Sequence, residues 1–178
     1  ARIEELTPDH AALAVTGSRS AEPIRPAVWL YVGLIKRDKF EWVLEKATEL
    51  GAAGIVPLDC DRSDKKDLKY DRARKIVVEA AEQSGRVWLP EIGAIKTVEE
   101  AVGETGPVAS FVLEADGQYT GEDVRHSQHE SLSLFIGPEG GWSERERAAF
   151  AQAGIATASF GSQNLKTETA AISALALT

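Results

Sequence analysis

The chain of 178 residues contains few of the residues that mark secreted, membrane or metal-binding proteins. Its one cysteine, Cys60, excludes an intrachain disulfide framework and a thiolate-rich metal cage. No run approaches the roughly 18 apolar residues of a membrane span, and the N-terminus lacks the basic, apolar and small-residue succession of a signal peptide. These absences exclude membrane and secretory classes and favour the cytoplasm. Because methionine is also absent, we expect a processed or excised segment.

Positive charge is scarce as well. The chain has 20 Lys+Arg against 28 Asp+Glu, a net charge of −8, which as a whole argues against a nucleic-acid partner. The acidity lies in the second half, since residues 36–86 carry 12 basic and 11 acidic residues. Seven cations gather at 62–75, including Arg62, Lys65 and Lys66. This patch has two interpretations, a solvated surface or contacts with nucleic-acid phosphates.

Hydrophobic periodicity predicts an α/β fold. Apolar residues recur at helical spacing in two segments, which predicts one helix that ends at Gly51 and another that ends at Gly85. Asp71 is a plausible N-cap for the second helix. The S-x-x-E spacing of a capping box predicts a helix that starts at Ser143, and a nearly uncharged last helix starts near Thr167. Such a helix should be packed on most of its surface, and another subunit is one candidate for the covering partner. Short apolar runs alternate with the helices and predict a mostly parallel sheet with helices on its faces, with strands at 28–32, 54–58, 108–113, 132–136 and 156–160.

Three loops should carry the chemistry, because ligands of open parallel sheets bind beyond the carboxyl ends of the strands. They are residues 113–117, 137–142 and 161–169. In the middle loop, Gly140 and Gly141 permit positive φ and leave main-chain groups uncovered, although a plain tight turn is an equal alternative. In the third, Lys166 and Glu168 form either a solvent ion pair or a polar rim around a reacting centre.

Other candidate sites are weaker. His126 and His129 have a spacing that a metal could use, but a third ligand is missing, so we expect a polar loop and no metal site. Cys60 lacks a histidine base nearby and is expected to pack in the core. Three tryptophans stand in or beside apolar patterns and are also expected in the core: Trp29, Trp42 and Trp88. A P-loop is a weak alternative, because residues 161–167 lack the glycine that a P-loop has before its lysine.

Four ordered segments carry a more specific signal. They are EKATELG at 45–51, EAAEQSGR at 79–86, FIGPEGGW at 135–142 and LKTETA at 165–170. Over residues 28–178 the chain resembles the bacterial methyltransferases that modify N3 of a uridine in the small-subunit (16S) ribosomal RNA, within the SPOUT (α/β-knot) superfamily. The resemblance implies a deep C-terminal trefoil knot, a homodimer and S-adenosylmethionine as methyl donor.

The resemblance also implies roles for residues of the three loops. Glu139 and Glu168 are candidate bases, with Lys166 and Arg86 as cations near the uracil or its phosphate, Arg86 acting across the dimer. Arg62, Lys65, Lys66 and Arg86 would contact RNA. The donor would be held by Leu113, Glu114, Gly117, Ile136, Gly137, Pro138, Glu139, Gly140, Phe160, Gly161, Leu165, Lys166, Thr167, Thr169 and Ala170.

Two departures from the family accompany the resemblance. Lys166 stands where the family usually has arginine, so a point charge replaces a planar, bidentate cation. The family also begins with an RNA-binding β-barrel similar to a PUA domain. Residues 1–23 are interpreted as a remnant of that barrel and its linker, and residues 24–178 as the methyltransferase domain. We therefore expect poor RNA affinity even where the donor site is intact.

Two other functions remain open at this point. One is a non-catalytic dimeric RNA-binding or assembly module on the same fold, and the other is methylation of a ribose 2′-hydroxyl. Which nucleotide is modified cannot be read from the sequence.

Overall fold

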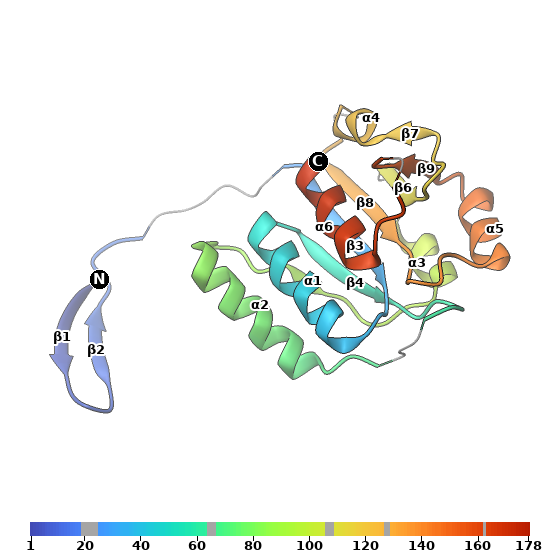
Figure 1. Ribbon diagram of the computed structural model, residues 1–178. Helices are drawn as coiled ribbons and strands as arrows, with labels where there is room; N and C mark the ends of the chain where they lie inside the picture. The colour runs from blue at the N-terminus through green and yellow to red at the C-terminus, as the bar shows by residue number, and fades with distance from the viewer. Residues whose placement is uncertain (19–24, 64–66, 106–108, 127–128, 162) are drawn as a thin grey trace.

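A seven-stranded sheet forms the centre of the computed structural model, which describes residues 1–18, 25–63, 67–105, 109–126, 129–161 and 163–178 (Figure 1). The strand order is β5-β4-β3-β8-β6-β9-β7 and every neighbouring pair is parallel. The predicted mostly parallel α/β sheet is thus confirmed. The strands are β3 (Ala27–Gly33), β4 (Gly54–Leu58), β5 (Glu91–Ile92), β6 (Ala109–Leu113), β7 (Tyr119–Thr120), β8 (Ser131–Ile136) and β9 (Ala156–Ser159).

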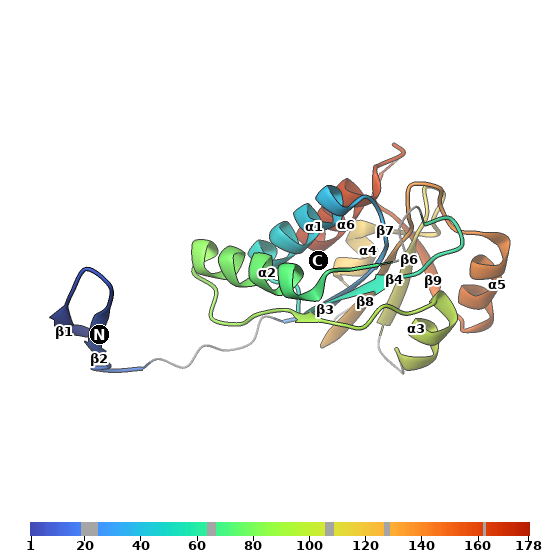
Figure 2. The same cartoon turned by 90° about the horizontal axis from the view of Figure 1, so that it is seen from below.

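Helices cover both faces of this sheet (Figure 2). On one face, α1, α2, α4 and α6 enclose a core that includes Leu30 and Leu134. On the other, α3 and α5 cover a second core that includes Tyr31 and Phe135, whose rings stack at 4.5 Å. Successive residues of one strand serve opposite cores, which explains why the strands are almost continuously apolar. The helices are α1 (Arg37–Leu50), α2 (Tyr70–Ser84), α3 (Val98–Glu104), α4 (Gly121–Arg125), α5 (Glu144–Gln152) and α6 (Thr167–Leu177).

The helix ends follow local chemistry, with one correction. Gly51 and Gly85 adopt left-handed conformations, with φ of 95° and 70°, and end α1 and α2 as predicted. Ser143 caps α5 and α6 starts at Thr167, also as predicted. The predicted N-cap Asp71 is wrong, because α2 starts one residue earlier and Asp71 lies in its first turn. There its negative charge favours the helix through the macrodipole rather than through a cap.

Two of the predicted core tryptophans are exposed. Trp42 is 40% and Trp88 is 54% exposed, whereas Trp29 is partly buried against the second core. Trp42 belongs to the outer side of α1, and Trp88 follows α2 in a run of exposed apolar residues with Val87 and Leu89. Trp42 and Trp88 stand beside apolar positions in the sequence, and for that reason the apolar pattern alone wrongly predicts them in the core.

The N-terminal residues form a separate hairpin of β1 (Arg2–Leu6) and β2 (Ala11–Ala14), which pair antiparallel (Figure 1). Most of its side chains are exposed, including Ile3, Leu6 and Leu13. Residues 19–24, at the proposed domain boundary, lie outside the described residues. No helix in the described part of the chain is long and apolar enough to cross a membrane.

Candidate functional site

Three loops meet at a cavity because the strands before them are neighbours. The order β8-β6-β9 places the ends of these strands side by side at the carboxyl edge of the sheet. The loops that follow them surround a cavity of about 520 Å³, within the size range of small-ligand sites. The three loops predicted from the sequence are therefore brought together.

Most residues predicted to hold a donor line this cavity. They are Leu113, Glu114, Ile136, Gly137, Pro138, Glu139, Gly140, Phe160, Gly161, Leu165, Lys166, Thr167 and Ala170. Gly117 and Thr169 do not belong to the lining. A Cβ at Gly117 would lie 2.3 Å from the carbonyl carbon of Ala158, so this glycine is needed for packing against β9. Thr169 is exposed on the first turn of α6.

The middle loop is held by close main-chain packing. A Cβ at Gly33, where β3 ends, would lie 2.7 Å from both Cδ and N of Pro138. Gly141 has φ of 68°, the positive value expected from the Gly-Gly pair. Gly140 instead allows close packing against Arg62, because a Cβ added at Gly140 would lie 2.9 Å from Cβ of Arg62. The Thr167 hydroxyl also donates to the Gly137 carbonyl at 2.8 Å, which ties α6 to this loop.

A buried carboxylate fixes the far end of the same loop. Glu146 is fully buried and closes the capping box, with the Ser143 N–H donating to its Oε2 at 2.7 Å. Its Oε1 accepts from the Asp61 N–H at 2.9 Å. The Ser143 hydroxyl donates to Asp61 Oδ2 at 2.6 Å. The segment after β4 is thereby joined to the start of α5.

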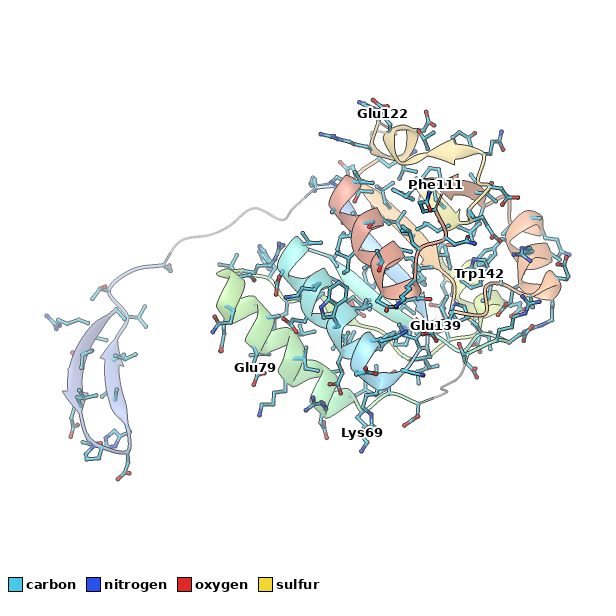
Figure 3. The ribbon with its side chains drawn as sticks, in the orientation of Figure 1. Lys69, Glu79, Phe111, Glu122, Glu139 and Trp142 are labelled. Carbon is cyan, nitrogen blue, oxygen red and sulfur yellow. The ribbon has the colours of Figure 1, made fainter. Side chains whose placement is uncertain are left out.

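Trp142 belongs to the wall of the cavity rather than to a stacking platform. It is 1% exposed, and its ring packs edge-on against Phe150 with centroids 4.9 Å apart. Its indole N–H donates to the Leu113 carbonyl at 3.4 Å, which connects the first loop to the second. Figure 3 shows Trp142 and Glu139 on the same loop.

The two candidate bases share a cation that sequence reasoning missed. Lys39, in the first turn of α1, forms a short hydrogen bond with Glu139 Oε1 and lies 3.5 Å from Glu168 Oε1. Figure 3 places Glu139 near the start of α1. The hydrogen bond to Glu139 raises the pKa of Lys39. The ion pair that Glu168 forms in the described structure is with this lysine from another helix, whereas a solvent pair with Lys166 was one of the two alternatives drawn from the sequence.

Glu114 carries the remaining carboxylate of the lining. Its two oxygens accept from Nε and Nη2 of Arg147 on α5, at 2.8 and 3.4 Å. This pairing raises the pKa of Arg147, with the hydrogen bond to Glu114 as the first cause. Arg147 also lines the cavity and was not predicted. Arg147 could have been predicted from the sequence, because it lies one turn after Ser143 in a helix that starts at the middle loop.

The predicted RNA-contacting cations occupy different places. Arg62 borders the site, since its Nη1 donates to the Gly140 carbonyl at 3.0 Å. Arg86 donates to the Glu49 carbonyl at 3.3 Å, where α1 ends and β4 is about to start. This is the amino edge of the sheet, so one chain does not bring Arg86 to the cavity. Lys65 and Lys66 lie outside the described residues.

The remaining candidates have local roles. Cys60 is fully buried, and burial raises the pKa of its thiol, as expected for a packing residue and not a nucleophile. His126 Nδ1 lies 2.8 Å from the Glu122 carbonyl of α4. Within the described ranges, no group of three His, Cys, Asp or Glu side chains is arranged to hold a metal ion.

The cavity suits a ligand that combines a flat apolar ring with a positive charge. Leu113, Ile136 and Phe160 supply apolar surface, and the glycines of the middle loop leave main-chain groups accessible. The carboxylates of Glu114 and Glu139 lie in the lining together with the cations Arg147 and Lys166, so acceptors for a positively charged group are present beside donors for a negative one. The residues present therefore fit S-adenosylmethionine, which has an adenine ring and a sulfonium.

Comparisons with known proteins agree with this geometry. Residues 22–178 match the model of a family described as an RNA methyltransferase domain. The chain is 34% identical over 183 residues to ribosomal RNA small subunit methyltransferase E of Synechocystis, covering 99% of this chain and 60% of that protein. It is 33% identical to the Bacillus subtilis protein of the same name, covering 83% and 63%. The chain thus spans about three fifths of the length of these relatives.

Solved structures give the same result. A ribosomal RNA small subunit methyltransferase E from Neisseria gonorrhoeae, bound to S-adenosylmethionine, is 30% identical with a TM-score of 0.78. The match covers 84% of this chain and 63% of that one. A SpoU methyltransferase from Streptomyces viridochromogenes is 15% identical with a TM-score of 0.57, over 86% of this chain and 59% of that one, which shows a shared fold alone. The trefoil knot stays a prediction.

Proposed function

This chain belongs to the RNA methyltransferase domain family, and from that membership we propose that it transfers a methyl group from S-adenosylmethionine to N3 of a uridine in 16S ribosomal RNA. The small ribosomal subunit is then its macromolecular partner and the cytoplasm its compartment. The observation that carries the proposal is the cavity at the ends of β8, β6 and β9, whose lining is largely the set of residues expected to hold the donor.

The three loops divide the work of donor binding. Glycine main chain of the middle loop accepts close approach by the adenosine, and Leu113, Ile136 and Phe160 contact its apolar surface. Glu114, oriented by Arg147, would be available to a positively charged group of the ligand. When bound, the donor supplies an electrophilic methyl group on a sulfonium. For transfer, the nucleophile would have to lie in line with that methyl carbon and about 3 to 3.5 Å from it.

The chain's remaining task is proton removal, because N3 of uridine is protonated at neutral pH. Glu139 and Glu168 are the proposed general bases, and their shared ion pair with Lys39 beside the cavity supports this choice. Lys166, at the N-cap position of α6, supplies positive charge toward the uracil oxygens as negative charge develops on the ring. The start of α6 contributes the positive end of its dipole at the same point.

RNA binding would draw on the cations beyond the cavity. Arg62 borders the middle loop, and Lys65 and Lys66 follow it in sequence, so these three are proposed to contact backbone phosphates. Arg86 is proposed to reach the cavity of a partner subunit in a homodimer.

Isothermal titration with S-adenosylmethionine tests the donor site directly. We expect one site per chain, and no binding by a chain whose fold is intact by circular dichroism would overturn the proposal. Placement of the methyl group by mass spectrometry, after incubation with undermethylated small subunits, separates the remaining functions. A methyl on the base supports N3 methylation, one on the ribose supports the 2′-hydroxyl, and donor binding without transfer supports a non-catalytic module.

A further inference from the structure

Lys39 connects segments that are far apart in sequence at the mouth of the cavity. It comes from α1, which follows β3, whereas Glu139 follows β8 and Glu168 lies in the first turn of α6, after β9. Its ammonium hydrogen-bonds Glu139 Oε1 and lies 3.5 Å from Glu168 Oε1. One cation therefore ties together the loops on two sides of the proposed donor site, and one of its partners, Glu139, is part of the lining.

The three side chains are partly shielded from water. The exposed fractions are 27% for Lys39, 33% for Glu139 and 15% for Glu168. The second oxygen of Glu168, Oε2, is buried and has no hydrogen-bond partner among the described residues. A shielded carboxylate with one unpartnered oxygen depends strongly on the ion pair that remains to it. Lys39 supplies that ion pair.

The charge of this cluster bears on the reaction that we propose. The donor is a sulfonium with a positive charge, whereas the product left after methyl transfer, S-adenosylhomocysteine, is a neutral thioether. A negative group beside the cavity thus favours the donor over the product, and a positive group does the opposite. Lys39 offsets one of the two negative charges carried by Glu139 and Glu168.

We infer that Lys39 is a positioning residue that holds Glu139 and Glu168 together and sets how strongly the cavity prefers the cationic donor to its neutral product. This inference rests on the proposed function, since it concerns the same cavity. Without Lys39, the two carboxylates would bind the cationic donor more tightly, but they would also oppose the loss of its positive charge during methyl transfer. Lys39 weakens both effects.

The test is the ratio of the dissociation constants for S-adenosylhomocysteine and S-adenosylmethionine, measured by isothermal titration. In K39M the ratio should rise about three-fold or more at low salt, because a positive charge is lost near the sulfonium. K39R should keep the wild-type ratio. K46M is the matched control, because Lys46 on the same helix also bridges two glutamates, Glu45 and Glu49, at 2.8 and 2.7 Å, but neither of these glutamates lines the cavity, whereas Glu139 does.

A second variant separates charge from simple loss of structure. E168Q should move the ratio in the direction opposite to K39M, and the double variant K39M/E168Q should return it toward wild type. If K39M does not fold, the shift of the ratio in E168Q still tests whether the charge of this cluster sets the preference for the donor. An unchanged ratio in folded K39M, or in E168Q where K39M is unfolded, overturns the role of Lys39. Failure of the wild-type chain to bind either ligand instead overturns the donor site itself.

Discussion

At the residue scale, the shape of the site depends on positions where a side chain would not fit. Gly33 has no unusual φ, and it is needed because Pro138 of the middle loop packs directly over the end of β3. Gly140 similarly makes room for the side chain of Arg62. These glycines bring the main chain of the middle loop onto the sheet, where its conformation is fixed before a ligand arrives.

Replacement of Gly33 by alanine should therefore damage both the fold and the donor site. Its Cβ would meet Pro138 at 2.7 Å, and overpacking of this kind costs about 1 to 3 kcal/mol of the free energy of unfolding. We expect G33A to unfold at lower urea concentration and to bind S-adenosylmethionine more weakly. In G103A, within α3, an added Cβ meets nothing within 4 Å, so stability should be unchanged or higher. Equal stability of the two variants would contradict the packing argument.

At the scale of elements, α5 does more than cover the sheet. Its capping box joins the middle loop to the segment after β4, because the Ser143 hydroxyl and the Glu146 carboxylate both bind Asp61. The same motif caps α3 at Thr97 and Glu100, where its bonds stay within the helix start. The two capping boxes are alike locally and differ in what else they hold.

The comparison of S143A with T97A measures this difference. Each substitution should lower the free energy of unfolding by about 0.5 to 2 kcal/mol through loss of an N-cap. Only S143A should also weaken donor binding, because it releases the bond to Asp61 at the end of the cavity-lining loop. Urea denaturation and isothermal titration report the two effects separately. Donor affinity that falls equally in T97A would show that the effect is general destabilisation.

For the whole molecule, the location of Arg86 bears on assembly. It lies at the amino edge of the sheet, opposite the cavity, so a role near the uracil requires a second chain. The three residues after it, Val87, Trp88 and Leu89, are between 51% and 69% exposed, an apolar surface next to the cation that must reach the partner. The homodimer proposed above would cover this surface.

Light scattering should accordingly give a mass of twice the 19.2-kDa chain. W88D, which places a charge on the exposed apolar segment, should shift the mass toward that of one chain. V15D is the control, because Val15 is 81% exposed and directly follows β2 of the N-terminal hairpin, outside the segment that follows Arg86. A dimer unaffected by W88D would mean that Arg86 does not act across this interface.

The sequence by itself determined the features that depend on neighbours along the chain. Apolar runs predicted five of the seven strands of the sheet but not the two-residue strands β5 and β7. Gly51 and Gly85 ended helices, and Ser143 with Glu146 started one, because these signals act over a few residues. The three loops were also predictable, since each directly follows a strand. Family resemblance added the ligand that the loops are proposed to hold.

Only the tertiary structure decided which distant residues share a site. The order β3-β8-β6-β9 places Lys39 beside Glu139, 100 positions later, and leaves Arg86 at the other edge. It also left Trp42 and Trp88 exposed where an apolar pattern suggested burial. Strand order has no local signature, because pairing between parallel strands depends on packing across the whole sheet rather than on the spacing of residues within one segment.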